Sequence, residues 1–498
     1  MRFALTAGLI ELLLPIQIQG STPQFLTSVT QDSRLVEPGG LYVARPGNKT
    51  NGLEFVNSAA ARGAALLLTA EPLPANLPLP AIRVKEFHPA FVTASHYITD
   101  DPSRKLDLIG ITGTNGKTST AHLVRSIFES SGSKCAMLTT IGYWTGAQLL
   151  EASLTTPDID RTCTLLSKAV SNGCQYGVME VSSHALDQGR VDRLRFRATG
   201  FSNLTQDHLD YHQTMESYFE AKLKLFQRQS PSDVAIINIS QSWGAKAARG
   251  AWGLVVTVGK EGSGADLTVA NLEHTARGAR YRLRWLGEAF EVGTHLVGDY
   301  QGENIALAAA IGLSMGLDLD TVKRGVESLK AVPGRMEAVD GGQPFAVLVD
   351  YSHTPDALER ALASLRSLTA GRLIAIFGCG GDRDKAKRPL MGRIAAQNAD
   401  FVYITSDNPR TENPSEICTE ILAGVPTELR SNVKVIVDRR EATFEAIASA
   451  KEGDVALLAG KGSESYLEVN GVRTPYDDRL VALEALSHAG YQRSEAAI

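Results

Sequence analysis

The chain has 498 residues, which is too long for one ordinary hydrophobic core and predicts two to four domains. Its formal net charge is −5 and no basic patch stands out, so the sequence argues against nucleic acid as a partner. Hydrophobic residues make up 43% of the chain and charged residues 21%, a balance typical of a globular protein in water.

The first fifteen residues are apolar, with Arg2 near the front, and imitate a signal peptide. Glu11 interrupts the run and no small-residue cleavage site follows promptly, so we predict a buried helix instead. No apolar run approaches the length of a membrane span. The five cysteines show no C-x-x-C spacing, which predicts neither a disulfide framework nor a zinc site. This cysteine usage suits a reducing compartment, and we expect a cytoplasmic protein.

Loop-forming sequences divide the chain into blocks. The stretch 71–80 carries Pro72, Pro74, Pro78 and Pro80, which predicts a loop. Residues 100–105 and 331–335 are the expected linkers between blocks. The predicted domains are therefore 1–105, 106–335 and 336–498.

The segment from Leu108 to Ser119 reads as an apolar strand, a glycine turn and the start of a helix. Gly113 and Gly116 can take a positive φ, so the backbone can close around phosphate oxygens while the first N–H groups of the helix point at the anion. Lys117 supplies a positive charge and the Thr118 hydroxyl a Mg²⁺ ligand. Ile111 stands where the usual G-x-x-x-x-G-K-T pattern has its first glycine. The predicted nucleotide-binding residues are Gly113, Thr114, Asn115, Gly116, Lys117, Thr118 and Ser119.

Short apolar runs separated by helical patterns continue through the second and third blocks and predict parallel strands covered on both faces. The expected strands are 106–111, 135–140, 176–181, 234–239, 345–349, 373–377, 401–405, 433–437 and 455–458. Polar, glycine-bearing sequences follow several of them. Because open parallel sheets bind ligands outside the carboxyl ends of their strands, we expect a site between two facing domains.

Six motifs in order resemble the Mur ligases, and within that family the members that add the third residue of the peptidoglycan stem peptide. The motifs are Thr112–Thr118 (TGTNGKT), Glu180–His184 (EVSSH), Asp207–His212 (DHLDYH), Gly334–Glu337 (GRME), Asp350–Pro355 (DYSHTP) and Asp407–Arg410 (DNPR). The segments 32–34 and 38–43 resemble the family's uridine-nucleotide domain. The resemblance implies an α/β protein with an N-terminal uridine-nucleotide domain, a central P-loop-type parallel-sheet ATPase domain and a C-terminal Rossmann-like domain.

The resemblance also implies an ATP-dependent amide ligation. ATP would phosphorylate the D-glutamate γ-carboxylate of UDP-MurNAc-L-Ala-D-Glu, and an incoming amine would then displace phosphate from the acyl phosphate. We expect small-molecule substrates, Mg²⁺ as the cofactor, no membrane partner and a monomer.

The family's catalytic and metal-binding positions match Lys117, Glu180, His208 and Lys222, together with Thr118. From the residue pattern alone, Lys222 is a solvated lysine, Glu180 a helix-cap partner and His208 a partly buried histidine. The family's lysine at this position is N-carboxylated, which implies that Lys222 is modified to a carbamate that bridges Mg²⁺.

The remaining assignments also rest on the resemblance. Further ATP contacts match Asn304, Arg335, Asp350 and His353, whereas Gln301 replaces the usual asparagine; without the resemblance, Asp-x-x-His after a strand is a turn and a cap. The positions expected to bind the UDP-MurNAc-dipeptide are Ser33, Asn48, Lys49, Thr50, Thr155, Thr156, Ser182, Gln188 and Arg190. The positions expected to bind diaminopimelate are Arg383, Asp407, Asn408, Pro409, Arg410, Gly460 and Glu464.

The amine substrate follows from the motif Asp407–Arg410, which matches members that use meso-diaminopimelate. Arg383 and Arg410 can fork to the distal carboxylate of this diacid, and Asp407 and Glu464 can accept from its ammonium groups. Lysine has no distal carboxylate, so the arginines would stay unpaired. Ser463 replaces the histidine that the family usually has beside Glu464.

Three alternatives stay open at this point. A lysine-adding member of the same family is the nearest one, and an assay with each amine separates the two. A folylpolyglutamate synthetase has a similar central domain, but the segments 32–34 and 407–410 argue against it. A nucleotide-regulated binding protein would bind ATP without releasing phosphate, and the intact Lys117, Glu180, His208 and Lys222 argue against that.

Overall fold

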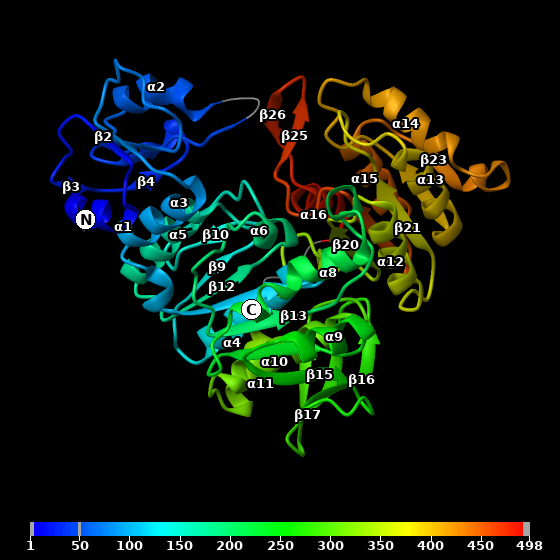
Figure 1. Cartoon of the computed structure of the whole chain (residues 1–498). Helices are drawn as coiled ribbons and strands as arrows, with labels where there is room; N and C mark the ends of the chain where they lie inside the picture. The colour runs from blue at the N-terminus through cyan, green and yellow to red at the C-terminus, as the bar shows by residue number, and fades with distance from the viewer. Residues whose placement is uncertain (1–3, 48–50, 492–498) are drawn as a thin grey trace. The chain divides into compact units, whose positions relative to one another are not determined.

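The computed structural model describes residues 4–47 and 51–491. The chain divides into two compact units, Met1–Leu267 with Leu307–Val322, and Thr268–Ala306 with Lys323–Ile498. Each unit is built around sheets flanked by helices (Figure 1).

The first unit begins with a small sheet of strand order β2-β7-β6-β5-β4, in which only β2 pairs antiparallel among the described strands. A second short pair joins β1 to β3. Short apolar runs form these strands because both faces of β5 and β6 are buried. The elements are β1 (Ala4–Leu5), α1 (Thr6–Leu13), β2 (Gln17–Gln19), β3 (Phe25–Leu26), β4 (Val29–Thr30), β5 (Leu41–Val43), α2 (Val56–Ala61), β6 (Leu66–Thr69), β7 (Ala81–Arg83) and α3 (Phe87–Ile98).

Helix α1 confirms the helix predicted near the N-terminus, but the prediction that it is buried is wrong for most of its length. Thr6 and Leu9 are its buried residues, whereas Leu12 is 57% exposed. An apolar composition does not fix burial when one face of a short helix has no neighbour to pack on.

The part of a larger sheet that lies in the first unit has its strands in the order β11-β10-β9-β12-β8-β13-β14-β15. The strands from β9 to β15 in this order run parallel, and β10 and β11 add an antiparallel edge. Their bounds are β8 (Asp107–Thr112), β9 (Cys135–Leu138), β10 (Tyr143–Trp144), β11 (Leu149–Leu150), β12 (Tyr176–Glu180), β13 (Ala198–Phe201), β14 (Val234–Asn238) and β15 (Leu254–Lys260). The helices between them are α4 (Lys117–Ser130), α5 (Ile159–Ser171), α6 (Ser183–Asp187), α7 (Leu209–His212), α8 (Met215–Leu223) and α9 (Ser242–Gly250).

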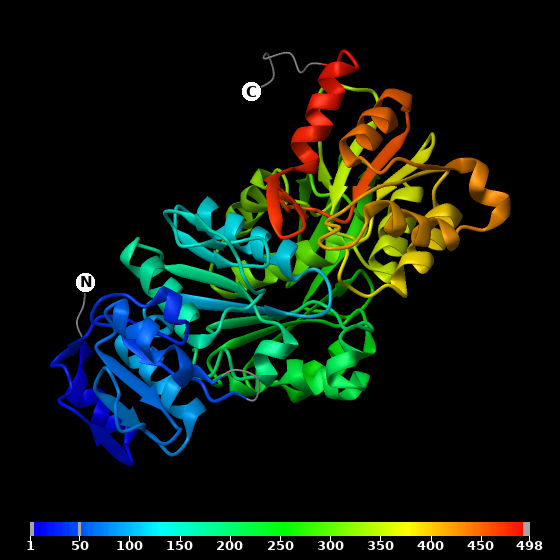
Figure 2. The same cartoon turned by 90° about the horizontal axis from the view of Figure 1, so that it is seen from above.

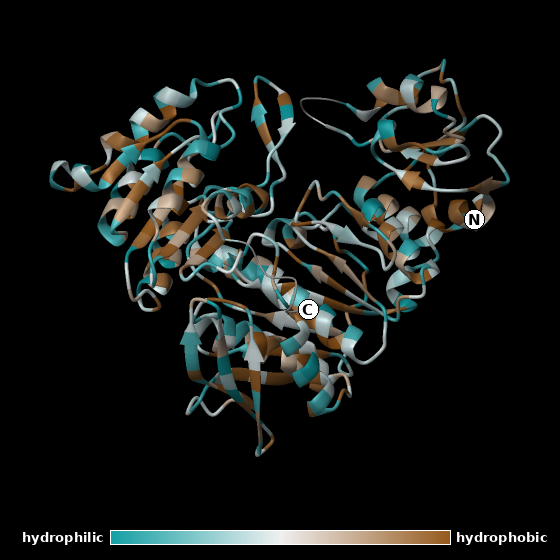
Figure 3. Cartoon of the chain, turned by 180° about the vertical axis from the view of Figure 1, so that it is seen from behind, coloured by the Kyte–Doolittle hydropathy of each residue, from teal (hydrophilic) through white to brown (hydrophobic). Residues whose placement is uncertain are grey.

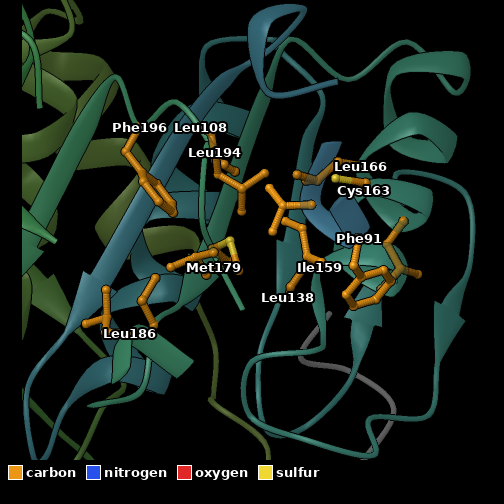
Figure 4. Close-up of a cluster of buried hydrophobic side chains, with 14 of the residues drawn as sticks. Phe91, Leu108, Leu138, Ile159, Cys163, Leu166, Met179, Leu186, Leu194 and Phe196 are labelled. Carbon is orange, nitrogen blue, oxygen red and sulfur yellow. The ribbon is translucent and has the colours of Figure 1, made fainter. Parts of the chain in front are cut away.

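The buried side chains beside this sheet come from the strands and from the helices that cover it. Leu108 and Met179 of neighbouring strands, Leu166 of α5 and Phe91 of α3 belong to one cluster (Figure 4). Since Phe91 precedes residue 105, the N-terminal part and the central sheet share this core. This shared core supports the strands whose ends carry the polar residues of the site.

The second unit contains a sheet of order β19-β20-β24-β21-β22-β23, parallel except for β19. One buried cluster contains residues of α12, α13 and α14, and another contains residues of α15 and α16, so helices cover both faces (Figure 2). The bounds are β19 (Glu337–Ala338), β20 (Ala346–Asp350), α12 (Pro355–Arg366), β21 (Leu373–Phe377), α13 (Lys387–Asn398), β22 (Phe401–Ile404), α14 (Pro414–Ala423), β23 (Val433–Val435), α15 (Arg439–Ser449), β24 (Val455–Ala459) and α16 (Asp478–His488).

Two further features of the second unit were not predicted. The strands β17 (Gly278–Trp285) and β18 (Glu288–Thr294) form an antiparallel hairpin after β16 (Leu267–Thr275). A second hairpin joins β25 (Tyr466–Val469) to β26 (Val472–Pro475). Helices α10 (Gln301–Ser314) and α11 (Leu319–Ser328) follow β18 along the chain, and residues 307–322 belong to the first unit.

All nine predicted strands are present, with ends that move by at most two residues. The stretches 71–80 and 331–335 contain no helix or strand, as expected of a loop and a linker, whereas residues 102–104 form a short 3₁₀ turn. Hydrophobic residues are frequent in the inner strands of the sheets, whereas the helices carry both hydrophobic and hydrophilic residues (Figure 3). Within the described part of the chain, no helix combines the length and the apolar character needed to cross a bilayer.

Candidate active site

The turn between β8 and α4 has the backbone that the sequence predicted. Gly113 has φ 143° and Gly116 has φ 84°. A Cβ on Gly113 would lie 1.9 Å from the Ser202 hydroxyl, so no larger residue fits without a shift. The loop is braced from the segment after β13, where Asn203 accepts from Thr114 N and Asn115 N at 2.9 Å each. Lys117 Nζ donates to the carbonyl oxygens of Gly113 and Thr114 at 3.0 and 2.8 Å, so its charge lies over the loop.

The Thr118 hydroxyl and the Glu180 carboxylate meet at this loop. Glu180 ends β12, next to β8, and is 1% exposed. Thr118 Oγ1 donates to Glu180 Oε1 at 2.9 Å, and the Thr140 backbone N–H donates to the same oxygen at 3.1 Å. The arrangement gathers hard oxygen ligands where the triphosphate of a bound nucleotide would end.

Lys222 is the largest departure from the residue pattern. It was predicted to be solvated, and this is wrong, because it is 1% exposed on α8. Its Nζ donates to Gly113 O at 2.8 Å and lies 4.5 Å from the centre of the Tyr218 ring. Burial, reinforced by the charge of Lys117, holds the pKa of Lys222 well below its ordinary value.

His208 lies near the same group of side chains. It has φ 52° at the start of α7, and its ring is 6.1 Å from the Tyr218 ring. Desolvation lowers the pKa of its imidazole; the charge of Asp207 opposes this effect, and the charges of Lys117 and Lys222 add to it. A neutral imidazole is the form that binds a metal ion.

Two of the nine residues expected to bind the muramoyl-dipeptide, Gln188 and Arg190, line a cavity of about 100 Å³ in the first unit. Arg190 bonds to Thr156 O at 3.2 Å and pairs with Asp158 at 3.3 Å, so it is not a loose surface arginine. Gln188 and Arg190 line the cavity together with Gln31, Arg45, Phe87, His88, Phe91, Asp158, Ile159 and Gly189.

Three of the other dipeptide positions lie beside Glu180. Thr156 Oγ1 donates to Glu180 O at 2.9 Å, and Ser182 N donates to Thr156 Oγ1 at 3.0 Å. Thr155 Oγ1 accepts from Thr140 at 3.3 Å. Ser33 is buried in a short turn of the N-terminal part and does not line the cavity. Asn48, Lys49 and Thr50 lie outside the described residues.

The nucleotide positions predicted in the second unit are engaged with the protein. The Asp350 carboxylate accepts from Met336 N at 2.8 Å and Ser352 N at 2.9 Å, which is the turn and cap that a bare Asp-x-x-His predicts. The Arg335 guanidinium stacks on the Tyr351 ring at 4.8 Å. Asn304 donates to Gln301 at 3.0 Å. His353 lies in the same loop, and burial lowers its pKa.

The positions predicted to hold the amine converge at the carboxyl ends of β21, β22 and β24. Arg410 Nη1 donates to Gly381 O at 2.8 Å, which holds its guanidinium against the loop that carries the exposed Arg383. The segment of Pro409 packs on Gly381, where a Cβ would lie 1.9 Å from Pro409 O. We name the segments 378–383, 406–410 and 460–464 the amine-site loops.

The acidic and amide side chains of the amine-site loops form a second group. Asn408 Nδ2 donates to Glu464 Oε2 at 2.8 Å. A Cβ on Gly460 would lie 2.8 Å from Asp407 Oδ2, so a glycine there lets the carboxylate approach the backbone. Burial and the nearby charge of Asp407 raise the pKa of Glu464.

Comparison with known families decides the membership of the chain. A family model described as the Mur ligase middle domain matches residues 111–312, and one described as the glutamate ligase domain of Mur ligases matches residues 334–462. The chain belongs to the Mur ligase family.

Individual Mur ligases resemble the chain over nearly its whole length. A UDP-N-acetylmuramoyl-L-alanyl-D-glutamate–2,6-diaminopimelate ligase of Gloeobacter violaceus is 43% identical over 93% of this chain and 94% of its own. The enzyme of the same name from Aquifex aeolicus is 40% identical over the same shares. A solved structure with that name is 31% identical, has a TM-score of 0.68 and covers 97% of this chain and 99% of its own.

A more distant structure shares the fold. A Mycobacterium tuberculosis folylpolyglutamate synthase is 17% identical, with a TM-score of 0.61, and covers 81% of this chain and 95% of its own. At this identity the likeness extends to the architecture alone.

The structure adds residues that the sequence of this Mur ligase did not point to. Thr140 and Asp158 contact predicted site residues, and Arg45 and His88 line the cavity. In the second unit, Arg388, Arg439 and Lys461 are buried beneath the amine-site loops. Of these three, only Lys461 could have been noticed in the sequence, because it stands beside Gly460. Arg388 and Arg439 lie in ordinary helical sequence.

Proposed function

We propose that this Mur ligase adds meso-2,6-diaminopimelate to the D-glutamate γ-carboxylate of UDP-MurNAc-L-Ala-D-Glu, with ATP as co-substrate. The observation that carries the proposal is the convergence of Arg410, Asp407 and Glu464 at one sheet edge, because a diamino diacid needs cationic and anionic partners together. The names of the relatives with about 40% identity agree with this substrate.

The chemistry begins with transfer of the γ-phosphoryl group of ATP to the γ-carboxylate, which releases ADP. The amine then attacks the acyl carbon, loses a proton and expels inorganic phosphate. Phosphoryl transfer depends on positioning and charge neutralisation. Lys117 is the side chain suited to neutralise phosphate charge, because its ammonium already lies over the loop carbonyls.

We propose Mg²⁺ as the metal that accompanies ATP. The buried Glu180 carboxylate beside Thr118 fits a hard cation. His208 lies close enough to Lys117 for the lysine's charge to help lower the pKa of its imidazole. Among residues 4–47 and 51–491, no cluster of three or more His, Cys, Asp or Glu side chains is arranged to hold a metal ion. Mg²⁺ usually takes one or two protein carboxylates and completes its shell with phosphates and water. When bound, the ion would neutralise phosphate charge.

The burial of Lys222 supports its proposed conversion to a carbamate. An amine whose pKa is held well below its ordinary value loses its proton more readily, and the deprotonated amine is the nucleophilic form. The modification would replace a buried cation beside Gly113 with an anion that can ligate Mg²⁺.

A phosphate-release assay tests the proposal. Purified protein receives ATP, Mg²⁺ and UDP-MurNAc-L-Ala-D-Glu, with either meso-diaminopimelate or L-lysine. We expect the rate with diaminopimelate to exceed that with lysine by about 100-fold or more, because unpaired buried charges penalise an analogue that lacks the distal carboxylate. A preference for lysine would identify a lysine-adding enzyme. Nucleotide binding without phosphate release from either amine would identify a binding protein.

We also propose three domains with boundaries at residues 105 and 335, location in the cytoplasm, and a monomeric state. The separate sheets before residue 105 and after residue 335 support these boundaries. Light scattering of the purified chain tests the monomer, and limited proteolysis tests the boundaries.

A further inference from the structure

The amine-site loops surround a buried lysine that no assignment above uses. Lys461 lies between Gly460 and Gly462 and is 0% exposed. A buried ammonium is costly unless charges and hydrogen bonds compensate it, so its partners indicate its role.

The partners of Lys461 are side chains predicted to hold the amine substrate. Its Nζ donates to Asn408 Oδ1 at 3.1 Å, and lies 3.8 Å from Asp407 Oδ1 and 3.6 Å from Glu464 Oε2. The rings of Tyr466 and Tyr476 each lie 5.8 Å from it. Lys461 therefore stands behind three of the predicted diaminopimelate-binding side chains and is itself shielded from solvent.

We propose that Lys461 is a positioning residue for the amine substrate, which orients Asn408 and supplies a positive charge behind the Glu464 carboxylate so that this carboxylate can receive an ammonium group. The inference rests on the proposed function and names a residue that acts through others, since Lys461 does not reach solvent.

The orientation of Asn408 follows from its hydrogen bonds. Its Oδ1 accepts from Lys461 Nζ and, at 3.0 Å, from Glu468 N, while its Nδ2 donates to Glu464 Oε2. A rotated amide would direct its NH₂ group at both of these donors. The lysine therefore helps to fix the direction in which Asn408 holds the Glu464 carboxylate.

The second role is electrostatic. Two carboxylates close to each other and partly buried disfavour ionisation, and burial and Asp407 raise the pKa of Glu464. Lys461 opposes that shift, so its removal raises the pKa of Glu464 further. The other polar groups near Glu464 are Asn408 and the phenols of Tyr351 and Tyr466, whose raised pKa values leave them neutral near pH 8.

Two variants of the full chain test the inference. Lys461→Met removes the charge and the donor, whereas Lys461→Gln removes the charge and keeps an N–H donor for Asn408. The matched control is Arg372→Met, which breaks the ion pair of Arg372 with Asp454, in which Nη2 and Oδ2 lie 2.7 Å apart. Both residues directly precede the first residues of strands β21 and β24, whereas the amine-site loops follow the last residues of these strands. Melting temperatures identify a variant that fails to fold, and Lys461→Gln alone then carries the test.

The measurement is the KM for each substrate and the pH profile of kcat/KM for meso-diaminopimelate between pH 6 and 9. For both Lys461 variants we expect the KM for diaminopimelate to rise at least fivefold, the KM for ATP to change less than twofold, and the acidic limb to move to higher pH. The control should keep the wild-type profile. In Lys461→Gln combined with Glu464→Gln, the shift of the acidic limb should disappear, because the titrating carboxyl is gone.

An unmoved acidic limb, a rise in KM below fivefold, or equal rises for ATP and diaminopimelate would overturn the inference. Wild-type protein that releases no phosphate with diaminopimelate would instead overturn the proposed function. The two failures are therefore distinguishable in one assay.

Discussion

The phosphate loop 113–119 and the amine-site loops stand at the carboxyl ends of parallel strands, but they are held in different ways. The phosphate loop is one continuous segment, shaped by two glycines with positive φ and braced through backbone contacts to Asn203. The amine-site loops come from three separate strands and are joined by charged side chains beneath them. Backbone geometry shapes the phosphate loop, whereas buried charge holds the amine-site loops together.

The buried arginines beneath the amine-site loops each connect segments of the chain that lie far apart in the sequence. The Arg439 guanidinium, paired with Asp478, donates to Ala459 O at 3.0 Å and Ser406 O at 3.4 Å. Arg388 pairs with Glu412, which accepts from Asp382 N. Changes to the backbone should therefore affect ATP use, and changes to these side chains should affect the choice and affinity of the amine.

Gly113→Ala tests the backbone side of this comparison and should have the largest effect. The new methyl group would meet the Ser202 hydroxyl at 1.9 Å and Asn203 O at 3.0 Å, at a φ that disfavours alanine. We expect loss of ATP binding by calorimetry and loss of phosphate release. Gly293→Ala, which has open space and no positive φ, is the control and should behave as wild type. ATP affinity unchanged in Gly113→Ala would show that the loop is not the nucleotide site.

Lys117→Ala should come next, because it removes a charge and leaves the backbone of the loop intact. We expect kcat to fall by about 10³-fold, the scale on which phosphate-neutralising groups act, with a melting temperature close to that of wild type. Lys168→Ala, an exposed lysine of α5, is the control. Full turnover of Lys117→Ala would exclude the assigned role.

Arg410→Lys tests the side-chain half of the comparison. An ammonium cannot reproduce the planar fork, and hydrogen bonds to charged groups are worth about 1.5–3 kcal/mol, so kcat/KM for diaminopimelate should fall by about 10- to 100-fold. The KM for ATP should stay within twofold. Arg393→Lys on α13 is the control. Equal losses for both substrates would contradict the assignment.

Arg388→Met should have the smallest kinetic effect, since Arg388 acts through Glu412 and the loop 378–383. Its guanidinium is 0% exposed and pairs with Glu412 at 2.9 Å and Glu420 at 2.7 Å. We expect a severalfold rise in the KM for diaminopimelate, an unchanged KM for ATP and a lower melting temperature. The control, Arg393→Met on the same helix, should leave all three unchanged. A rise confined to the KM for ATP would break the comparison.

The sequence predicted the parts of the molecule that local patterns determine. The apolar runs located nine strands, and the positive φ of Gly113 and Gly116 followed from the glycine turn. The six motifs and their order resembled the family that the comparisons then showed. Several predicted side chains of the amine site also lie together as expected, because neighbouring parallel strands end at the same edge.

Tertiary packing determines the rest. Lys222 sits on a helix whose sequence gives no sign of burial, and its environment depends on Gly113, more than a hundred residues earlier. Arg388, Arg439 and Lys461 are charged residues, which patterns place on the surface. Their burial follows from carboxylates and carbonyl groups supplied by other strands. Helix α1 is the opposite case: its sequence is mostly apolar, yet Leu12 is exposed because burial also needs a neighbour to pack on.

The desolvated amine of Lys222 has a consequence for how this protein would respond to its surroundings. Conversion of such an amine to a carbamate consumes carbon dioxide and releases a proton, and the reaction reverses in acid. An enzyme that depends on this group would lose activity in degassed, bicarbonate-free solution and regain it when inorganic carbon returns. Peptidoglycan precursor supply would then be tied, through one buried side chain, to a dissolved gas.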